Sequence, residues 1–353
     1  MTSTAERAGY RPPQERVRAR GGLTARALGL LAAAAVLVAV VAVSIAVGAK
    51  PIPLGTVWDV LFSHGANTED VRIVFDLRIP RTLIGLAAGI ALGLAGALMQ
   101  ALTRNPLADP GILGINAGAA AAVVLAIRVL GVGSLTGYIW FAFVGAAGAF
   151  LVVYLLGTSG HASASPERLA LAGAAVGAAL LSVTNAVALL DTTTFDRYRL
   201  WTVGSLAGRD LTVLWGVLPF ILAGTVIAIA LGPSLNVIAL GEDTARGLGA
   251  NLDRTRVLSA VAVTALCGAA TAAVGPIAFV GLAVPHIARA LVGPDQRWLL
   301  PYSLLLAPIL LLAADVIGRV VARPGELEAG LVAALLGAPI FLAVVLHRRI
   351  VPL

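Results

Sequence analysis

The sequence predicts an all-α, polytopic membrane protein with about ten transmembrane helices, and two observations support this prediction. The 353 residues are 59% hydrophobic and only 12% charged, with a mean hydropathy of +0.95, which is far too apolar for a soluble domain of this size. The apolar residues also fall into successive charge-poor runs. Many of these runs have the length of about 20 residues that a helix needs to cross a bilayer core of about 30 Å.

The chain opens on a basic segment that precedes the first membrane span. Residues 1–26 contain six arginines and no helical or strand period, and we expect them to form a disordered tail in the cytoplasm. The first apolar run, Ala27–Val47, is longer than the signal-peptide core of about 7 to 15 residues. We therefore interpret it as an uncleaved signal anchor, in preference to a cleaved signal. The membrane domain is expected to occupy residues 27–348, and residues 349–353 a cytoplasmic tail.

Nine further apolar runs bring the expected number of spans to ten. They are Thr82–Ala101, Ile112–Leu130, Gly137–Gly157, Leu169–Leu190, Leu211–Leu231, Val257–Val274, Ile277–Leu291, Leu299–Gly318 and Ala329–Leu346. The eighth span is short and follows the seventh after a Gly-Pro turn, so its boundary is the least sharply defined. With the N-terminus in the cytoplasm, the inner segments hold 15 of the 25 basic residues, in agreement with the positive-inside rule. We therefore expect both termini in the cytoplasm.

The second span has one face without bulky side chains. Gly85, Gly89, Gly93 and Gly96 recur there at three- or four-residue spacing. Small residues let neighbouring helices approach closely, so we expect this span to be tightly packed. A similar order of arginines, Ala/Gly-rich helix and Pro/Gly break returns five spans later, which predicts an inverted internal repeat. Chance similarity between Ala/Gly-rich helices explains this pattern equally well.

Several kinds of chemistry are disfavoured by what the sequence lacks. The one lysine, Lys50, is followed by proline, so the chain has no GxxxxGK[ST] phosphate loop and any nucleotide hydrolysis must come from another chain. A single cysteine, Cys267, provides no disulfide and no structural zinc or iron–sulfur site, and we expect no cofactor or metal. The middles of the ten spans lack ionisable residues, which argues against an ion-coupled carrier and an intramembrane hydrolase. The net charge of +7 comes from dispersed membrane-flanking arginines and does not indicate a nucleic-acid-binding face.

The loop between the sixth and seventh spans, about residues 235–256, is too polar to enter the membrane. Its residues Ala239–Leu248 favour a helix, which Gly247 and Gly249 can end. We expect a short helix lying at the cytoplasmic surface. Ordinary loops contain such helices too, but the order Gly-Glu-Asp-x-Ala-x-x-Leu-Gly resembles the coupling loop of ATP-binding-cassette (ABC) importers, which docks on an ATPase subunit.

Four motifs occur together in the order and spacing of one family. They are RIPRTLIGLAAGIALGLAGALMQALTRNPLADPGILGINAGA, the loop just described, GPIAFVGLAVPHIAR and GELEAGLVAALLGAPIFL. Over about residues 50–348 the chain resembles the FecCD-type permeases, the membrane subunits of ABC importers for ferric siderophores, haem and cobalamin. The resemblance implies a ten-span, non-catalytic permease that pairs with a second permease chain, binds two ATPase subunits inside the cell and receives substrate from an external binding protein.

The resemblance also implies roles for two sets of residues. The ATPase-coupling positions are Gly241, Glu242, Asp243, Ala245, Leu248 and Gly249. The positions that dock the binding protein are Arg78, Arg81 and Arg319, because guanidinium groups bind carboxylates through paired hydrogen bonds. Arg78 and Arg81 stand three residues apart at a helix start, where the helix dipole does not favour their charge and an outside carboxylate would. Alternatively, the arginines only anchor helix ends at the lipid headgroups, and Asp315 pairs with Arg319.

One departure from the family pattern precedes the last span. Families of this type often have Glu-Leu-Pro there, whereas this chain has Glu326-Leu327-Glu328, so no proline supports the start of the short outer helix expected at this point. Taken together, the sequence predicts a permease of the bacterial cytoplasmic membrane for an iron-chelate-class substrate, with ferric siderophore ahead of haem or cobalamin. An ion-coupled secondary carrier and a structural membrane scaffold are the competing interpretations.

Overall fold

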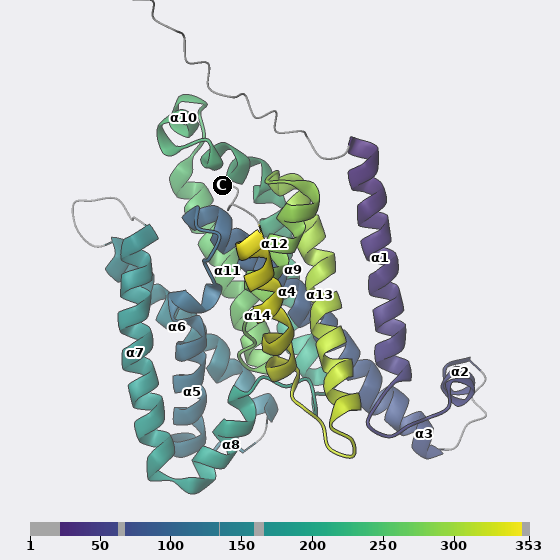
Figure 1. The fold of residues 1–353 in the computed structure, drawn as a ribbon. Helices are drawn as coiled ribbons and strands as arrows, with labels where there is room; N and C mark the ends of the chain where they lie inside the picture. Colours follow the sequence, from purple (N-terminus) through teal and green to yellow (C-terminus); the bar gives the residue numbers. More distant parts are fainter. Residues whose placement is uncertain (1–21, 63–67, 134, 159–165, 348–353) are drawn as a thin grey trace, which may run out of the picture.

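The regular structure of the described residues is entirely helical. The computed structural model describes residues 22–62, 68–133, 135–158 and 166–347. Its helices form one bundle with two ends (Figure 1). One end carries the short helix α10 (Glu242–Gly247), and the opposite end carries α8 (Thr192–Thr202), α2 (Leu54–Phe62) and α3 (Thr68–Arg72). We refer to these as the α10 end and the α8 end.

Ten helices in the described residues correspond to the ten expected spans of an all-α, polytopic membrane protein. They are α1 (Leu23–Ala46), α4 (Ile79–Thr103), α5 (Ile115–Leu130), α6 (Leu135–Thr158), α7 (Pro166–Leu190), α9 (Leu211–Ala239), α11 (Leu252–Val274), α12 (Val280–Val292), α13 (Gln296–Val321) and α14 (Ala329–His347). Within the described ranges, seven stretches are long and apolar enough to cross a bilayer, and α5, α12 and α14 are shorter. α1 begins and α14 ends towards the α10 end, as an even number of crossings requires (Figure 1).

Some helix boundaries differ from the sequence-based expectation. α1 begins at Leu23, inside the segment expected to be a tail, and the tails expected at the two termini otherwise lie outside the described residues. α3 continues through a π-helical turn, η1 (Ile73–Arg78), directly into α4. Proline is compatible with the first turn of a helix, where its missing N–H has no intrahelical partner, and Pro80 occupies that turn of α4. A 3₁₀ turn, η2 (Pro110–Leu113), precedes α5.

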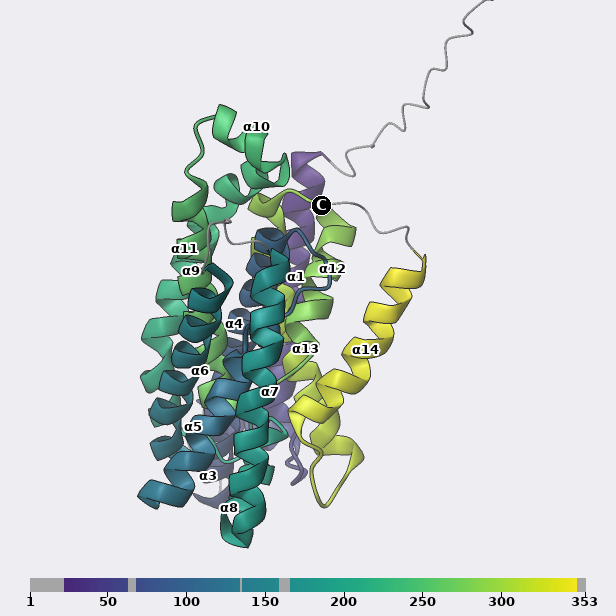
Figure 2. The same cartoon turned by 90° about the vertical axis from the view of Figure 1, so that its left-hand side faces the viewer.

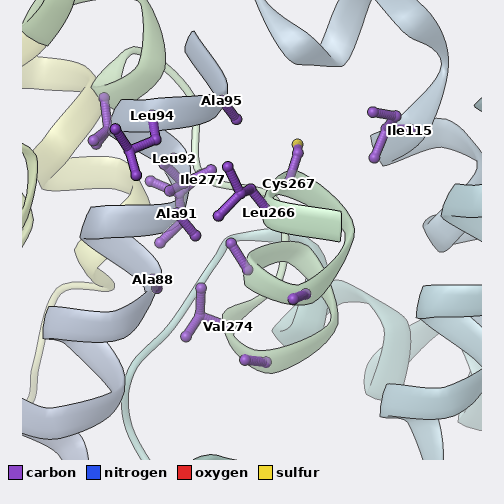
Figure 3. Packing of buried hydrophobic residues seen from close by; sticks show 14 of the residues in the cluster. Ala88, Ala91, Leu92, Leu94, Ala95, Ile115, Leu266, Cys267, Val274 and Ile277 are labelled. Carbon is purple, nitrogen blue, oxygen red and sulfur yellow. The ribbon is translucent and has the colours of Figure 1, made fainter. Parts of the chain in front are cut away.

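α4 lies at the centre of the bundle (Figures 1 and 2). It packs against α9, α11, α12 and α13, and its residues are buried almost continuously over the second half of the helix. Figure 3 shows residues of α4 and α11, among them Ala91 and Leu266, in the same buried cluster. The predicted second span is therefore the helix around which the others are arranged.

The glycine face of α4 is used for close helix contacts, which confirms the predicted tight packing. A Cβ atom at Gly89 would collide with the backbone of Pro308 in α13, and one at Gly96 would collide with the carbonyl oxygen of Gly281 in α12. At Gly93 a Cβ would lie 2.8 Å from a carbonyl oxygen of α13. Backbone cannot give way as a flexible side chain does, so these positions hold α4 directly against α12 and α13.

α1 lies at the edge of the bundle and packs mainly on α13 (Figure 1). Only 11% of its most apolar window is buried. Near the α10 end, the hydroxyl of Tyr302 in α13 donates to the carbonyl oxygen of Arg26 at 2.8 Å. At the α8 end, α1 is held by arginine side chains, which form the first candidate site.

Candidate functional sites

Arg78 binds the C-terminal end of α1. Its Nη1 donates to the carbonyl oxygens of Ile45 at 3.0 Å and Ala46 at 2.6 Å, and its Nη2 donates to that of Lys50 at 2.7 Å. The residue is only 4% exposed. The last carbonyl groups of a helix lack intrahelical partners, and a cation interacts favourably with that end of the helix dipole. Arg78 therefore caps α1 from η1.

Arg319 binds the same end of α1 from α13. Its Nη1 donates to the carbonyl oxygens of Ser44 at 3.0 Å and Val47 at 2.9 Å, and its Nη2 donates to Ser44 Oγ at 2.9 Å. Nη2 also lies 2.8 Å from Asp315 Oδ2, one helical turn earlier. Arg323, just beyond α13, donates to the carbonyl oxygen of Gly48 at 2.7 Å. Three guanidinium groups thus hold the end of α1.

Arg81 joins α4 to α13 and to the loop before α14. Its Nε and Nη2 donate to Asp315 at 3.1 and 2.7 Å, and its Nη1 donates to Glu326 Oε2 at 2.7 Å. The Asp315 side chain is fully buried, whereas that of Glu326 is 30% exposed. Burying charges costs free energy, which good geometry and further hydrogen bonds offset. Asp315 meets this condition because it lies between two arginines, Arg81 and Arg319.

The structure brings the three predicted docking arginines together at the α8 end, but it satisfies their charges inside the chain. Arg78 points to α1 and Arg81 points to α13. Acceptors within the chain therefore favour the charges of these two arginines, in addition to any carboxylate outside it. The pairing of Asp315 with Arg319, considered as an alternative, is confirmed. Docking itself stays a prediction.

The short outer helix expected before the last span does not form: residues 322–328 are turn and loop, in a segment that lacks the proline suited to the first turn of a helix. α14 itself begins at Ala329, as predicted for this span. The carbonyl oxygen of Glu328 accepts hydrogen bonds from the backbone N–H groups of Leu331 and Val332. The N–H of Gly330 donates to the carbonyl oxygen of Gly204 at 2.9 Å, so the start of α14 is also attached to the loop after α8.

The second candidate site is α10, which forms within the loop predicted to contain a short surface helix. It begins after Gly241, whose φ of +101° lies in a region that L side chains rarely adopt. Gly249, with a φ of +78°, follows the helix. Glycine adopts such angles without steric cost, so these two predicted positions shape both ends of α10.

α10 has an inner and an outer face. Ala245 is fully buried and packs with Ile238 of α9 and Leu252 of α11 in a small apolar cluster. In contrast, Leu248 is 64% exposed, and the Asp243 side chain is fully exposed. The predicted coupling residues therefore divide into Ala245, which fixes the helix to the bundle, and Asp243 and Leu248, which are available to another protein.

Glu242 belongs to the inner face, where arginines from three elements approach it. Arg256 of α11 donates a hydrogen bond from Nη2 to Glu242 Oε1. Arg104, at the end of α4, lies 3.7 Å from the same oxygen, and Arg246 of α10 lies 3.7 Å from Oε2. Arg104 and Arg256 could not be associated with Glu242 from the sequence, because no helical or strand spacing connects the three.

A cavity of about 630 Å³ adjoins this cluster. Its walls come from α4, α6, α7, α9 and α11 and from the loop after α4, and they are largely apolar, with Leu113, Phe150 and Leu169 among them. Arg104, Glu242 and Arg256 also line it. The charged cluster therefore lies beside open space, between the end of α4 and α10.

Asp295 links α9 to α13 at the same end of the bundle. Its Oδ1 accepts hydrogen bonds from Asn236 Nδ2 at 2.6 Å and from the N–H of Arg297 at 3.0 Å, which caps α13. The N–H of Gln296 in turn donates to Asn236 Oδ1 at 2.8 Å. Hydrogen bonds from the Arg297 side chain and then from Asn236 lower the pKa of Asp295 to about 2. This link joins residues about sixty positions apart and has no signal in the sequence.

The described residues contain no group of three or more His, Cys, Asp or Glu side chains placed to hold a metal ion. Cys267, the one cysteine, is buried in α11. His286 of α12 is 9% exposed and contacts the ring of Phe341 edge-on. Neither residue belongs to a candidate site, and the candidate functional surfaces lie at the two ends of the bundle.

The sequence of this chain was compared with models of known protein families. The model of the FecCD transport family matches residues 36–347. The chain belongs to the FecCD transport family. This FecCD chain is 50% identical over 300 residues to the ferric enterobactin transport system permease protein FepD of Escherichia coli, covering 85% of this chain and 89% of FepD. It is 42% identical over 286 residues to the Fe(3+)-citrate import system permease protein YfmD of Bacillus subtilis, covering 81% and 83% of the two chains.

A solved structure shares the fold of the FecCD chain over nearly its whole length. The similar chain is from a metal-chelate type ABC transporter in an inward-facing conformation, and it superposes with a TM-score of 0.81 at 26% identity. The match covers 91% of this chain and all of the other. The expected fold class and family are therefore confirmed.

Proposed function

We propose that this FecCD chain is the permease subunit of an ABC importer that carries a ferric siderophore across the bacterial cytoplasmic membrane. The observation that carries the proposal is the 50% identity to FepD, a ferric enterobactin permease, across almost the whole membrane domain. Ferric siderophore is preferred to haem or cobalamin on this ground. An ion-coupled carrier is disfavoured, because such proteins place ionisable groups near mid-membrane, whereas the buried Asp315 lies near the α8 end of α13 and is engaged by two arginines.

The proposed energy source is ATP hydrolysis in separate subunits bound at α10. The sequence lacks a phosphate loop of its own, and the outer face of α10 is free within the chain to contact a partner. In this arrangement the α10 end faces the cytoplasm and the α8 end faces the outside. The chain pairs with a second permease chain, identical or related, as expected for a permease of this family.

The test of this proposal is reconstitution. We expect the chain to copurify in mild detergent with its ATPase and a second permease chain. Liposomes containing that complex should accumulate ferric enterobactin when ATP and the substrate-loaded binding protein are supplied on the correct sides. Uptake that requires an ion gradient and ignores ATP would contradict the proposal.

Variants of α10 test the site of ATPase docking. Gly247 has open space where its Cβ would lie, so Gly247→Trp adds bulk to the outer surface without a collision inside the chain. We expect this variant to lose substrate-stimulated ATP hydrolysis while binding-protein docking continues. Gly249 is a poorer choice, because its positive φ makes any substitution strain the backbone. Wild-type stimulation in assembled Gly247→Trp complexes would exclude this surface.

For the α8 end, we propose that the binding protein docks over the arginine cluster and contacts Arg81. One of its two carboxylate partners, Glu326, is partly exposed, so a carboxylate of the binding protein could replace Glu326 without disturbing the buried Asp315. Arg78 and Arg319 would then act mainly by holding α1 and α13 in place.

Binding kinetics test the docking proposal. We expect Glu326→Gln to raise the association rate of the binding protein, because it removes both a competing partner and a repelling charge, and Arg81→Glu to lower it. Rim charges act chiefly on association rate and its salt dependence. The rates should be measured by surface immobilisation of the complex across a range of ionic strength. Equal rates and equal salt slopes for both variants and the wild type would place docking elsewhere.

A further inference from the structure

We propose that Glu242 is a positioning residue that transmits movement of α10 to the end of α4. The proposal rests on the proposed function, in which α10 contacts the ATPase, but it concerns the opposite face of the helix. The family resemblance assigned Glu242 to ATPase contact. The geometry instead points its carboxylate at arginines of this chain.

The Glu242 side chain points towards arginines of the permease itself. Its carboxylate accepts a hydrogen bond from Arg256 of α11 and faces Arg104 of α4. The side chain is 29% exposed, whereas that of Asp243, the next residue, is fully exposed. Of these two adjacent carboxylates, only that of Glu242 reaches other elements of the permease, and it connects α10 with α4 and α11.

Arg104 occupies the turn at the end of α4. This residue ends α4 with a φ of +48°, one of two positive φ angles among the described residues other than glycine. Such a conformation is uncommon and fixes the turn into the loop that continues to η2. A force on the Arg104 side chain therefore acts on the end of α4 and the start of that loop together.

α4 is packed rigidly against its neighbours. Its glycines place it in direct backbone contact with α12 and α13, so displacement of its end cannot be absorbed by soft side chains in between. Because packed interiors transmit strain, a shift at Arg104 reaches the centre of the bundle. The cavity beside Arg104 and Glu242 supplies the space into which that end can move.

An ion pair is suited to connecting α10 with α4, because a cavity lies between the two helices and direct packing is not available there. Ala245 couples α10 to α9 and α11 by direct packing. Between Glu242 and Arg104, in contrast, the separation is 3.7 Å beside open volume, where opposite charges attract without close contact. Glu242 thus adds α4 to the set of helices that follow α10.

The experiment uses the assembled importer complex with ferric enterobactin-loaded binding protein. Basal and stimulated ATP hydrolysis, uptake per ATP and the melting temperature are measured for Glu242→Gln, Glu242→Asp, Arg104→Gln and the Glu242→Gln/Arg104→Gln double variant. Asp253→Asn is the matched control, because Asp253 also lies near Arg256, at 3.9 Å, but its side chain is 94% exposed.

We expect Glu242→Gln to reduce stimulation about 2- to 30-fold, the range found for residues that modulate coupling between sites. Glu242→Asp should restore part of it, Asp253→Asn should leave it unchanged, and Arg104→Gln should add little to Glu242→Gln. The proposal is overturned if the effects of Arg104→Gln and Glu242→Gln add fully. It is equally overturned if Glu242→Gln lowers only the melting temperature or the yield of complex. A wild-type chain that binds no ATPase would overturn the proposed function, and this inference with it.

Discussion

Arg78 has a structural role that its position in the sequence does not reveal. The sequence placed this arginine correctly at the start of a span. Its three acceptors, however, are carbonyl oxygens of α1 and the following loop, about thirty residues earlier. No motif predicts a backbone acceptor, because every residue type provides one. The residue could be found from the sequence, but its partners could not.

The first prediction at this scale concerns the capping of α1. Arg78→Met should lower stability by about 1.5 to 3 kcal/mol, the range for hydrogen bonds that involve a charged group. Arg72→Met is the control, because the Arg72 side chain is 78% exposed and its pair with Asp76 is a surface pair. Thermal unfolding of the purified chain in detergent measures the difference. Equal losses in the two variants would show that the contacts of Arg78 do not stabilise the fold.

A second prediction follows from the lowered pKa of Asp295. Because the folded pKa of about 2 lies below the ordinary value of about 3.9, this carboxylate stabilises the fold above about pH 4. That contribution is lost as the pH falls towards 2. Asp295→Ala should therefore cost about 1 kcal/mol at neutral pH, as for loss of a helix N-cap.

The pH dependence of the Asp295 effect is measured by unfolding wild type and variant in detergent at successive pH values. The gap between them should be constant from pH 7 to about pH 5 and should narrow below that. A gap that grows as the pH falls has the opposite sign and would refute the assignment.

At the scale of single elements, the glycines of α4 permit a sharper prediction than their spacing did. Gly96→Ala should destabilise the chain, because the new methyl group meets the carbonyl oxygen of Gly281 and forces α4 away from α12. The expected cost is about 1 to 3 kcal/mol. Its measure is the melting temperature in detergent.

Gly148→Ala in α6 is the matched control for that experiment. Nothing lies within 4 Å of the Cβ position at Gly148, so the substitution meets no neighbour and replaces glycine by a better helix former. We expect the stability of this variant to equal or exceed that of the wild type. If Gly96→Ala and Gly148→Ala behave alike, the contact between α4 and α12 is not as close as described.

The helices could be predicted from the sequence where a local pattern of apolar residues determines them. Apolar runs predicted all ten helices that correspond to the expected spans, since burial in lipid or in the bundle requires continuous apolar sequence. Their ends were less predictable. α9 continues past Pro233 to Ala239, because neighbouring helices and local adjustment can compensate the carbonyl that proline leaves free. α10 was predicted from turn residues, but the direction of Glu242 depends on Arg104 and Arg256, which reach it only through tertiary packing.

At the scale of the whole molecule, the two ends of the bundle are predicted to face opposite compartments. Gly247→Cys places a thiol at the α10 end, and Leu54→Cys places one at the α8 end, where Leu54 is 70% exposed. Cys267 is 2% exposed and should give little background. A membrane-impermeant maleimide added to intact spheroplasts should label Leu54→Cys, and should label Gly247→Cys only after permeabilisation. The reverse pattern would invert the proposed topology.

The expected pairing with a second permease chain rests on the family resemblance and not on any pattern in this sequence. Exposed leucines on a membrane helix are equally suited to lipid and to another apolar helix, so neither composition nor burial in one chain identifies a partner permease. The predicted internal repeat likewise stays a prediction. The expectation of a partner permease therefore comes from family membership.

The attachment of α1 has a consequence for the order in which the protein is made. α1 is the first described helix to leave the ribosome, yet Ser44 near its end receives hydrogen bonds from Arg319, 275 residues later. Contacts of such long sequence separation form late, because closing a long loop must precede them. Until α13 has been synthesised, α1 therefore lacks its main packing partner, and its C-terminal end is held by Arg78 of η1 and Thr82 of α4. The hydrogen bonds from Arg319 complete this attachment in a chain whose biogenesis is nearly finished.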